Sequence, residues 1–169
     1  MKMTSRTKFI KWYVRPFNRL KRVKNGDGAF IILSMGIALC ERYFRIKSNC
    51  IKSDYIPPVF YVTAAKSFGC TADDFEIFWN VYRHGLQHRA QPQIWIKWWN
   101  KGRTKKVKTR FKWSISANNG LCPKIVDTPK GKVVCVFPND FTYFILKKFL
   151  SDDKTLQRSV RHQFGDIYP

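Results

Sequence analysis

Five large apolar residues mark one face of a helix and set the architecture that the rest of the chain must complete. Counted from the first, the others follow at 3, 4, 7 and 11 residues, the repeat of an α-helix buried along one side; they are Phe75, Phe78, Trp79, Tyr82 and Leu86. Thr71 is placed to cap the start of this helix, and acidic residues follow in its first turns, where the helix dipole favours them. We therefore expect a helix over 71–88, which Pro92 prevents from continuing.

Other segments predict more helix and a small amount of β-structure. The run 29–40 is apolar except for Ser34 and Gly36, and it predicts a helix over 29–47 that is buried on most sides. Helices are expected over 59–68, closed by Gly69, and over 141–150. Residues 111–115 and 133–137 have the alternation of strands and are expected to pair as a hairpin across a long loop.

These elements predict a mainly α fold, α+β by count, with four parts. Residues 1–25 form a basic, aromatic N-terminal arm in which Pro16 is expected to interrupt any helix. Residues 26–92 form the helical core, and residues 93–150 contribute a basic loop, the hairpin and a short helix. Residues 151–169 form a polar tail that we expect to fray.

The charge of the chain points to a polyanionic partner. Lys and Arg number 32 against 11 Asp and Glu, which gives a net charge of +21. A disordered basic tail is excluded because 44% of the residues are hydrophobic and 16% are aromatic. So large a charge repels itself, and a polyanion relieves that repulsion. Nucleic acid is the first candidate, and an anionic membrane facing the N-terminal arm is the second.

Cysteine spacing and missing motifs exclude several other classes. The five cysteines are odd in number and contain no CxxC pair, so we expect reduced thiols, a cytoplasmic location and no zinc site. The longest apolar run has 12 residues, whereas a transmembrane helix needs about 20. No HExxH, phosphate-loop, GxGxxG or GxSxG pattern occurs, and no cofactor is expected.

The end of the 71–88 helix carries a candidate catalytic group. Arg83, His84 and His88 lie within six residues, and two of the three histidines of the chain are among them. On a regular α-helix both histidines point away from the apolar face, toward a cleft, a partner or solvent. The alternative is a solvated helix end, where basic side chains meet the negative end of the dipole.

Arg83 followed after four residues by His88 resembles the R-x4-6-H motif of the HEPN superfamily. In that family a polar residue follows the Arg, and His84 meets this pattern. An apolar helix with an acidic residue, here Glu41, precedes the motif, and the resemblance covers residues 29–92. It implies a small helical bundle that dimerises and forms a metal-independent ribonuclease site across the interface. Many such proteins are toxins or antiviral defence effectors.

The resemblance implies a role for each motif residue. A histidine near neutral pKa can take the proton of the RNA 2′-hydroxyl, and another can protonate the leaving 5′-oxygen. We expect His88 to be the acid/base, Arg83 to hold the phosphate, and His84 to position the substrate or act as the second acid/base. The products would be a 2′,3′-cyclic phosphate and a 5′-hydroxyl.

A second candidate surface follows the motif in the chain. Residues 97–112 hold eight basic residues and no acid: Lys97, Lys101, Arg103, Lys105, Lys106, Lys108, Arg110 and Lys112. Basic residues alternate over 105–110, as on a strand with one charged face. The tryptophans at 95, 98, 99 and 113 flank the run, a combination that suits single-stranded nucleic acid. We expect Trp79 and Trp113 to belong to the core.

The sequence leaves three functions open. The first is a homodimeric HEPN-type endoribonuclease acting on RNA. The second is a non-catalytic basic protein that binds RNA in preference to DNA, alone or as a subunit of a larger nucleoprotein complex. The third is an inhibitor that binds an acidic protein partner by charge.

Overall fold

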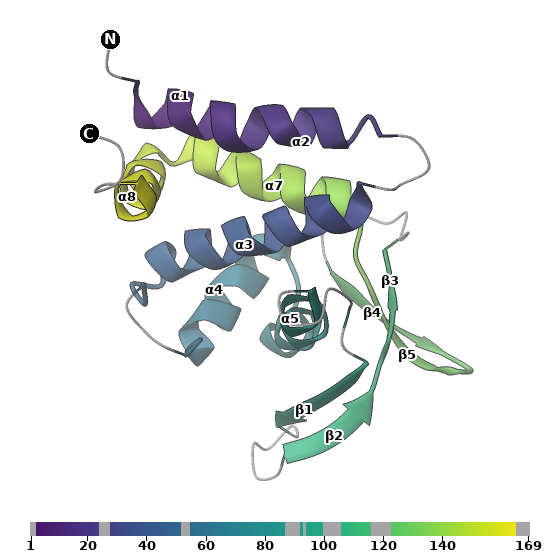
Figure 1. The fold of residues 1–169 in the computed structure, drawn as a ribbon. Helices are drawn as coiled ribbons and strands as arrows, with labels where there is room; N and C mark the ends of the chain where they lie inside the picture. The colour runs from purple at the N-terminus through teal and green to yellow at the C-terminus, as the bar shows by residue number, and fades with distance from the viewer. Residues whose placement is uncertain are drawn as a thin grey trace. The chain divides into compact units, whose positions relative to one another are not determined.

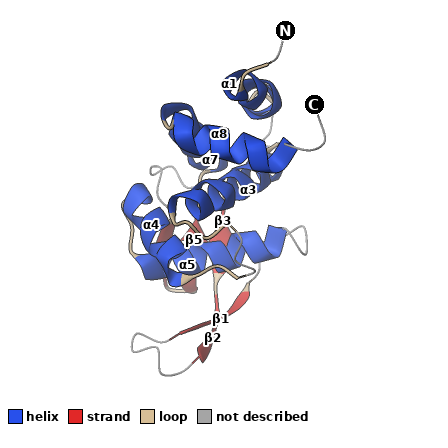
Figure 2. Ribbon diagram, turned by 90° about the vertical axis from the view of Figure 1, so that its left-hand side faces the viewer, coloured by secondary structure: helices blue, strands red, loops and turns tan. Residues whose placement is uncertain are grey.

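The computed structural model of the chain describes residues 3–23, 28–51, 55–86, 92, 94–99, 106–115 and 123–164. The chain is mainly α-helical with a small amount of β-sheet, which confirms the predicted class (Figures 1 and 2). It divides into two compact units. Unit 1 comprises Met1–Phe60 and Pro138–Pro169, and unit 2 comprises Tyr61–Phe137.

Unit 1 is built on the contact between two helices, α3 (Ala29–Lys47) and α7 (Pro138–Ser151). The predicted bounds of α3 are confirmed. Gly36 has no side chain where α7 approaches, and a Cβ at that position would collide with Oγ1 of Thr142. The Thr142 hydroxyl donates to the Ile32 carbonyl at 2.9 Å, so the two helices are also joined by a buried hydrogen bond.

Two predictions about the N-terminal half of unit 1 are wrong. Pro16 does not interrupt the helix: α1 (Ser5–Phe9), a π-helical turn η1 (Ile10–Val14) and α2 (Arg15–Leu20) follow without a break. Pro16 comes just after the π turn, whose wider hydrogen-bond spacing joins the Arg15 N–H to the Ile10 carbonyl, and such an irregularity lets a helix continue past a proline. The helix α3 is also less enclosed than expected, since Ile31 is 58% exposed.

Most of the predicted polar tail is a helix as well, α8 (Asp153–Phe164), contrary to the expected fraying, and residues 165–169 lie outside the described part of the chain. Asp152 caps it, because its Oδ1 accepts from the backbone N–H of Thr155 at 3.1 Å. Leu156 and Val160, one turn apart, are buried and fix the helix to α1, α3 and α7. Residues 151–169 are polar on average, so their composition predicts no helix. The spacing of the buried Leu156 and Val160 is the sequence feature that indicates one.

Unit 2 contains the helix predicted over 71–88. It begins as α5 (Ala72–Trp79), and Thr71 caps it by accepting from the N–H of Asp74 at 3.1 Å, as predicted. Its apolar face is buried, and the rings of Phe68 and Phe75 stack at 5.4 Å. Phe68 is the last residue of the preceding helix α4 (Pro58–Phe68), which Gly69 follows with a φ of 73°.

Two small sheets complete unit 2. The first pairs β1 (Trp95–Trp99) with β2 (Lys106–Arg110), antiparallel. The second has the order β3-β5-β4. Its strands are β3 (Lys112–Ser114), β4 (Lys124–Thr128) and β5 (Gly131–Cys135).

The predicted strand pairing is half right. β3 and β5 are neighbours, but they run parallel and do not form a hairpin. The hairpin partner of β5 is β4, across the tight turn at Pro129 and Lys130. The segment predicted as a basic loop contains the β1–β2 hairpin instead.

Among the described residues no helix is both long and apolar enough to cross a bilayer. Within the same residues no cluster of His, Cys, Asp or Glu has the composition of a metal site.

Candidate nucleic-acid interface

The β1–β2 hairpin sorts its residues by face. In its register Trp95 is opposite Arg110, Lys97 is opposite Lys108, and Trp99 is opposite Lys106. These pairs share one face of the ladder, because facing residues lie on the same side and the side alternates along each strand. The alternate register positions, Ile96, Trp98, Val107 and Thr109, fall on the other face. By register, the aromatic and basic positions named above therefore fall on one face of the ladder.

The contact between Trp95 and Lys108 agrees with this assignment. The Lys108 ammonium lies 5.1 Å from the centroid of the Trp95 ring, a cation–π distance. Trp95 is 46% exposed, and Lys108 and Arg110 are exposed as well. An accessible ring thus has a cation beside it, the arrangement that places a phosphate next to a stacked base.

The part of the sequence that contains this face has no acidic residue. No acidic residue occurs between Glu76 and Asp127, a stretch that holds 11 Lys and Arg. A polyanion bound to the exposed Lys108 and Arg110 would supply the missing counter-charge.

The eight predicted basic residues divide into three groups. Lys97, Lys106, Lys108 and Arg110 occupy the aromatic and basic face of the hairpin. Lys112 lies in β3 and is exposed. Lys101, Arg103 and Lys105 lie outside the described residues.

Two of the three candidate catalytic residues lie on an irregular turn. After Trp79 the helix widens into a π-helical turn, η3 (Asn80–His84), and Arg83 and His84 are its last two residues, both half-buried. His88 lies outside the described residues. The orientation expected for a regular α-helix does not apply to His84, since a π turn rotates less per residue.

Asn80 and Tyr82 fix this turn in place. The Asn80 side chain donates to the Glu76 carbonyl at 2.9 Å, and the backbone N–H of Asn80 donates to the same oxygen. The Tyr82 hydroxyl is buried and lies 2.9 Å from the carbonyl oxygens of Ser114 and Val134. Burial raises the pKa of Tyr82 well above its ordinary value, so the hydroxyl stays a donor. The turn is thereby attached to the β3-β5-β4 sheet.

The π turn and the hairpin are neighbours, because β1 contacts η3 within unit 2. Arg83 and His84 therefore belong to the same part of the fold as the aromatic and basic face. The sequence places the two groups only 11 residues apart, between His84 and Trp95, but gives no sign that they pack together.

The acidic residue of the predicted motif, Glu41, is in unit 1 and has a structural role. Its carboxylate accepts from Arg45 Nε at 2.9 Å, one helical turn further along α3. Both side chains are largely buried, at 16% and 13% exposed. The Arg45 guanidinium also donates to the Cys50 carbonyl, which ties down the end of the helix.

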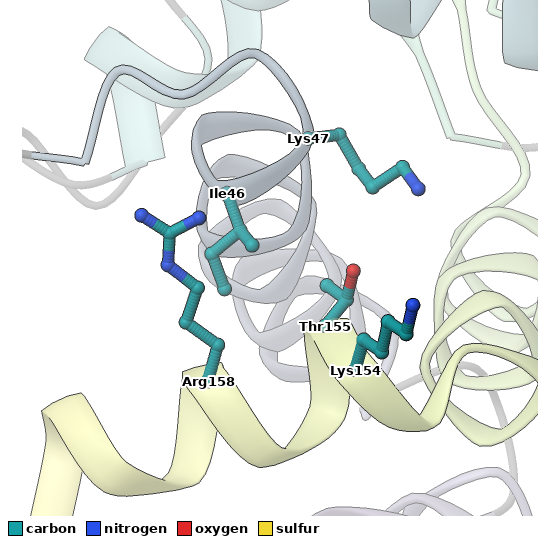
Figure 3. Close-up of a pocket in the computed structure, with 5 residues that line it drawn as sticks. All are labelled: Ile46, Lys47, Lys154, Thr155 and Arg158. Atoms are coloured by element: carbon teal, nitrogen blue, oxygen red, sulfur yellow. The ribbon is translucent and has the colours of Figure 1, made fainter.

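Unit 1 contains a hollow of about 180 Å³ with three cations at its wall (Figure 3). Ile46 and Lys47 come from α3, and Lys154, Thr155 and Arg158 come from α8. Lys47 already pairs with Asp152 at 3.1 Å, and the Arg158 guanidinium lies 3.4 Å from the Asn49 side-chain oxygen. Part of the charge is thus used within the fold, in contrast to the hairpin.

Two features of the interface are missed by sequence reasoning. Trp113 is 38% exposed and not a core residue, whereas Trp79 is fully buried as expected. The error arises because β3 is a short strand at the edge of its sheet. The signal for the hairpin was present: 95–99 and 106–110 are two β-prone runs separated by a glycine-containing segment.

Comparison of the chain with protein-family models, with curated proteins and with solved structures returned no match.

Proposed function

We propose that the protein binds single-stranded nucleic acid, RNA in preference to DNA, through the aromatic and basic face of the β1–β2 hairpin. The observation that carries the proposal is the exposed Trp95 ring, which has the Lys108 ammonium 5.1 Å from its centroid and the exposed Arg110 opposite it in the register. Phosphates neutralise the cations, and bases stack on exposed rings.

Single strands are favoured over duplexes because of Trp95. Its ring is accessible and stands beside Lys108, so an unpaired base can stack on it while the adjoining phosphate meets the ammonium. In a duplex each base is already stacked and cannot use the ring. RNA is favoured because its loops and ends present unpaired bases, the usual targets of RNA-binding proteins.

The test is a binding titration of a labelled oligouridine at a series of salt concentrations. The variant Lys108→Gln/Arg110→Gln removes two exposed cations from the face. Loss of two phosphate contacts should reduce the slope of log affinity against log salt by about 1.4, at roughly 0.7 per contact on single strands.

A matched control is Lys66→Gln/Lys124→Gln, which removes the same charge from exposed positions elsewhere in unit 2. Its slope should stay near that of the wild type. Equal losses in the two variants would mean that only the net charge matters, and the hairpin proposal would fail.

A second candidate function is RNA cleavage of the HEPN type, with Arg83, His84 and His88 as catalytic residues and a homodimer as the active form. The observation that favours it is the π turn at Asn80–His84, since such turns are frequent at functional sites. The contact of β1 with this turn adds to it, because RNA held by the hairpin would lie near Arg83 and His84.

Cleavage is tested with labelled oligoribonucleotide in excess EDTA. The wild type should produce 2′,3′-cyclic phosphate ends. His88→Ala should abolish them without loss of binding, and Arg83→Ala should abolish them with some loss of binding, because Arg83 is expected to hold the phosphate. His162→Ala removes the third histidine, outside the motif, and should cleave normally. Binding without cleavage by any of the proteins would leave the motif with a structural role only.

A further inference from the structure

The N-terminal helix of unit 1 carries a row of cations on its outer side. Lys11, Arg15 and Arg19 are exposed and follow one another at four-residue intervals. Four residues of α-helix advance by slightly more than one turn, and four residues of the wider π turn at Ile10–Val14 by slightly less. The three cations therefore follow one another along the same side of the helix, over about 12 Å at the helical rise per residue.

The row has no counter-charge in the described part of the chain. Residues 1–26 contain no acid, and no carboxylate of the described residues pairs with these three side chains. Arg6, on the same helix, behaves differently: it lies 3.5 Å from Asp153 and donates to the Leu150 carbonyl. Like charges one turn apart destabilise a helix, so the row is unfavourable in the free protein.

The inner side of the same helix is already used. Phe9 and Phe17 are 1% and 2% exposed. The Phe9 ring lies 5.0 Å from that of Phe149, and the Phe17 ring stacks on Tyr143 at 6.3 Å, both on α7. A helix binds a bilayer by inserting its apolar face. Here that face is committed to the core, so the charge complementarity of the row favours a nucleic acid over a membrane.

We propose that Lys11, Arg15 and Arg19 form a second nucleic-acid contact, which binds the phosphate backbone and does not read bases. This inference rests on the proposed function. The inference extends the proposed function, because a row of charges without an accessible ring does not distinguish single strands from duplexes. The hairpin, in contrast, gives the preference for single strands.

The test compares two labelled RNAs of equal length, an oligouridine and a blunt duplex, against Lys11→Gln/Arg15→Gln/Arg19→Gln. All three positions are on the surface, so the fold should be kept, which circular dichroism checks. The control Lys66→Gln/Lys130→Gln/Lys154→Gln removes the same charge from exposed positions on three other elements. Vesicles of phosphatidylserine and phosphatidylcholine serve as a third probe.

The expected result is that the row variant binds both RNAs at least about tenfold more weakly than the control, with a salt slope smaller by about 2.7 on the duplex. Duplex binding equal to that of the control would overturn the proposal. Loss of vesicle binding with RNA binding unchanged would also overturn it and assign the row to a membrane.

Failure of this proposal is distinguishable from failure of the hairpin proposal. If the row variant weakens binding to both RNAs while Lys108→Gln/Arg110→Gln has no specific effect, the row stands and the hairpin proposal falls. If the wild type binds neither RNA, both fall.

Discussion

Trp95 is the residue whose replacement best distinguishes binding by base stacking from binding by charge attraction. Its ring is 46% exposed and has the Lys108 ammonium 5.1 Å from its centroid. The accessible part of this ring can take a stacked base, and such stacking contributes about 1 to 3 kcal/mol per base. We therefore expect this single side chain to affect single-strand binding strongly.

Replacement Trp95→Ala should weaken oligouridine binding by about 5-fold to 150-fold, the range that corresponds to the loss of one stacked base. Duplex binding should change little, because it does not use the ring. Anisotropy titrations with both RNAs measure the two effects. Tyr55→Ala removes another exposed ring, in unit 1, and is expected to bind as the wild type does. Equal losses on the duplex would argue against stacking.

Also at the residue scale, Gly36 has no Cβ, and this allows helices α3 and α7 to pack closely at their contact. A Cβ at this position would collide with Thr142 Oγ1 and approach Phe141 Cδ1 to 3.1 Å. The sequence marks Gly36 only as an interruption of an apolar run, because the partner lies more than a hundred residues away. No local pattern can reveal such a contact.

Gly36→Ala should lower the free energy of unfolding by about 1 to 3 kcal/mol through overpacking. Urea denaturation followed by circular dichroism measures this. Thr142→Ala removes the colliding hydroxyl, so the double variant should be more stable than the sum of the two single losses predicts. If the losses in unfolding free energy of the two single variants simply add in the double variant, the cost of Gly36→Ala does not come from the collision with Thr142.

At the scale of elements, local signals predicted most helices well and failed where tertiary contacts decide. The bounds of α3 and the Thr71 cap follow from composition and capping alone. The direction of β3 does not, because the parallel pairing with β5 depends on how the chain returns through β4. Likewise α8 has a polar composition and is held by Leu156, Val160 and the Asp152 cap.

The start of α8 carries a charge network that predicts an effect of pH. Asp152 accepts from Thr155 and from the Lys47 ammonium at 3.1 Å. Burial acts to raise the pKa of Asp152, but these hydrogen bonds and the nearby ammonium prevail and hold the pKa below its ordinary value. Near pH 4 the unfolded chain therefore binds more protons at this residue than the folded one. The stability it contributes is complete above that pH and is lost as the pH falls through the lower, folded pKa.

Asp152→Asn keeps a capping oxygen and removes the charge. At pH 7 the variant should unfold at a lower urea concentration, by about 0.5 to 1 kcal/mol in free energy, the size of a partly exposed ion pair. Well below pH 4 the difference should disappear. Lys154→Gln, which removes a neighbouring charge that forms no ion pair among the described residues, should not show this convergence. If the unfolding free energies of Asp152→Asn and the wild type differed by the same amount at every pH, the role proposed for the Asp152 carboxylate would be contradicted.

At the scale of the whole molecule, the distribution of charge explains more than its total. The net charge of +21 is enough to predict a polyanionic partner. It does not say which cations are used within the fold and which are left for a partner. Arg45, Lys47 and Arg6 are paired within unit 1. Lys108 and Arg110 of the hairpin, and the three cations of the Lys11 row, form no ion pair among the described residues.

At the candidate catalytic group the structure differs from the sequence prediction. The sequence predicted a regular helix for Arg83 and His84, and the structure places them on a π turn held by Asn80 and Tyr82. The geometry of a π turn depends on the contacts of its neighbours, so the helical repeat could not predict it. If the proposed second function holds, the hairpin that contacts this turn would be its substrate-binding surface.

The location of a bound RNA tests the central claim most directly. Oligouridine containing 4-thiouridine would be bound to the wild type, crosslinked by light and digested with a protease that cuts at acidic residues. No such residue lies between Glu76 and Asp127, so a crosslink to the hairpin must appear in one long peptide, and chymotrypsin then narrows it. We predict crosslinks at Trp95 and its neighbours in β1 and β2, lost on competition with unlabelled oligouridine. Crosslinks confined to unit 1, with none between residues 95 and 110, would contradict the proposed function.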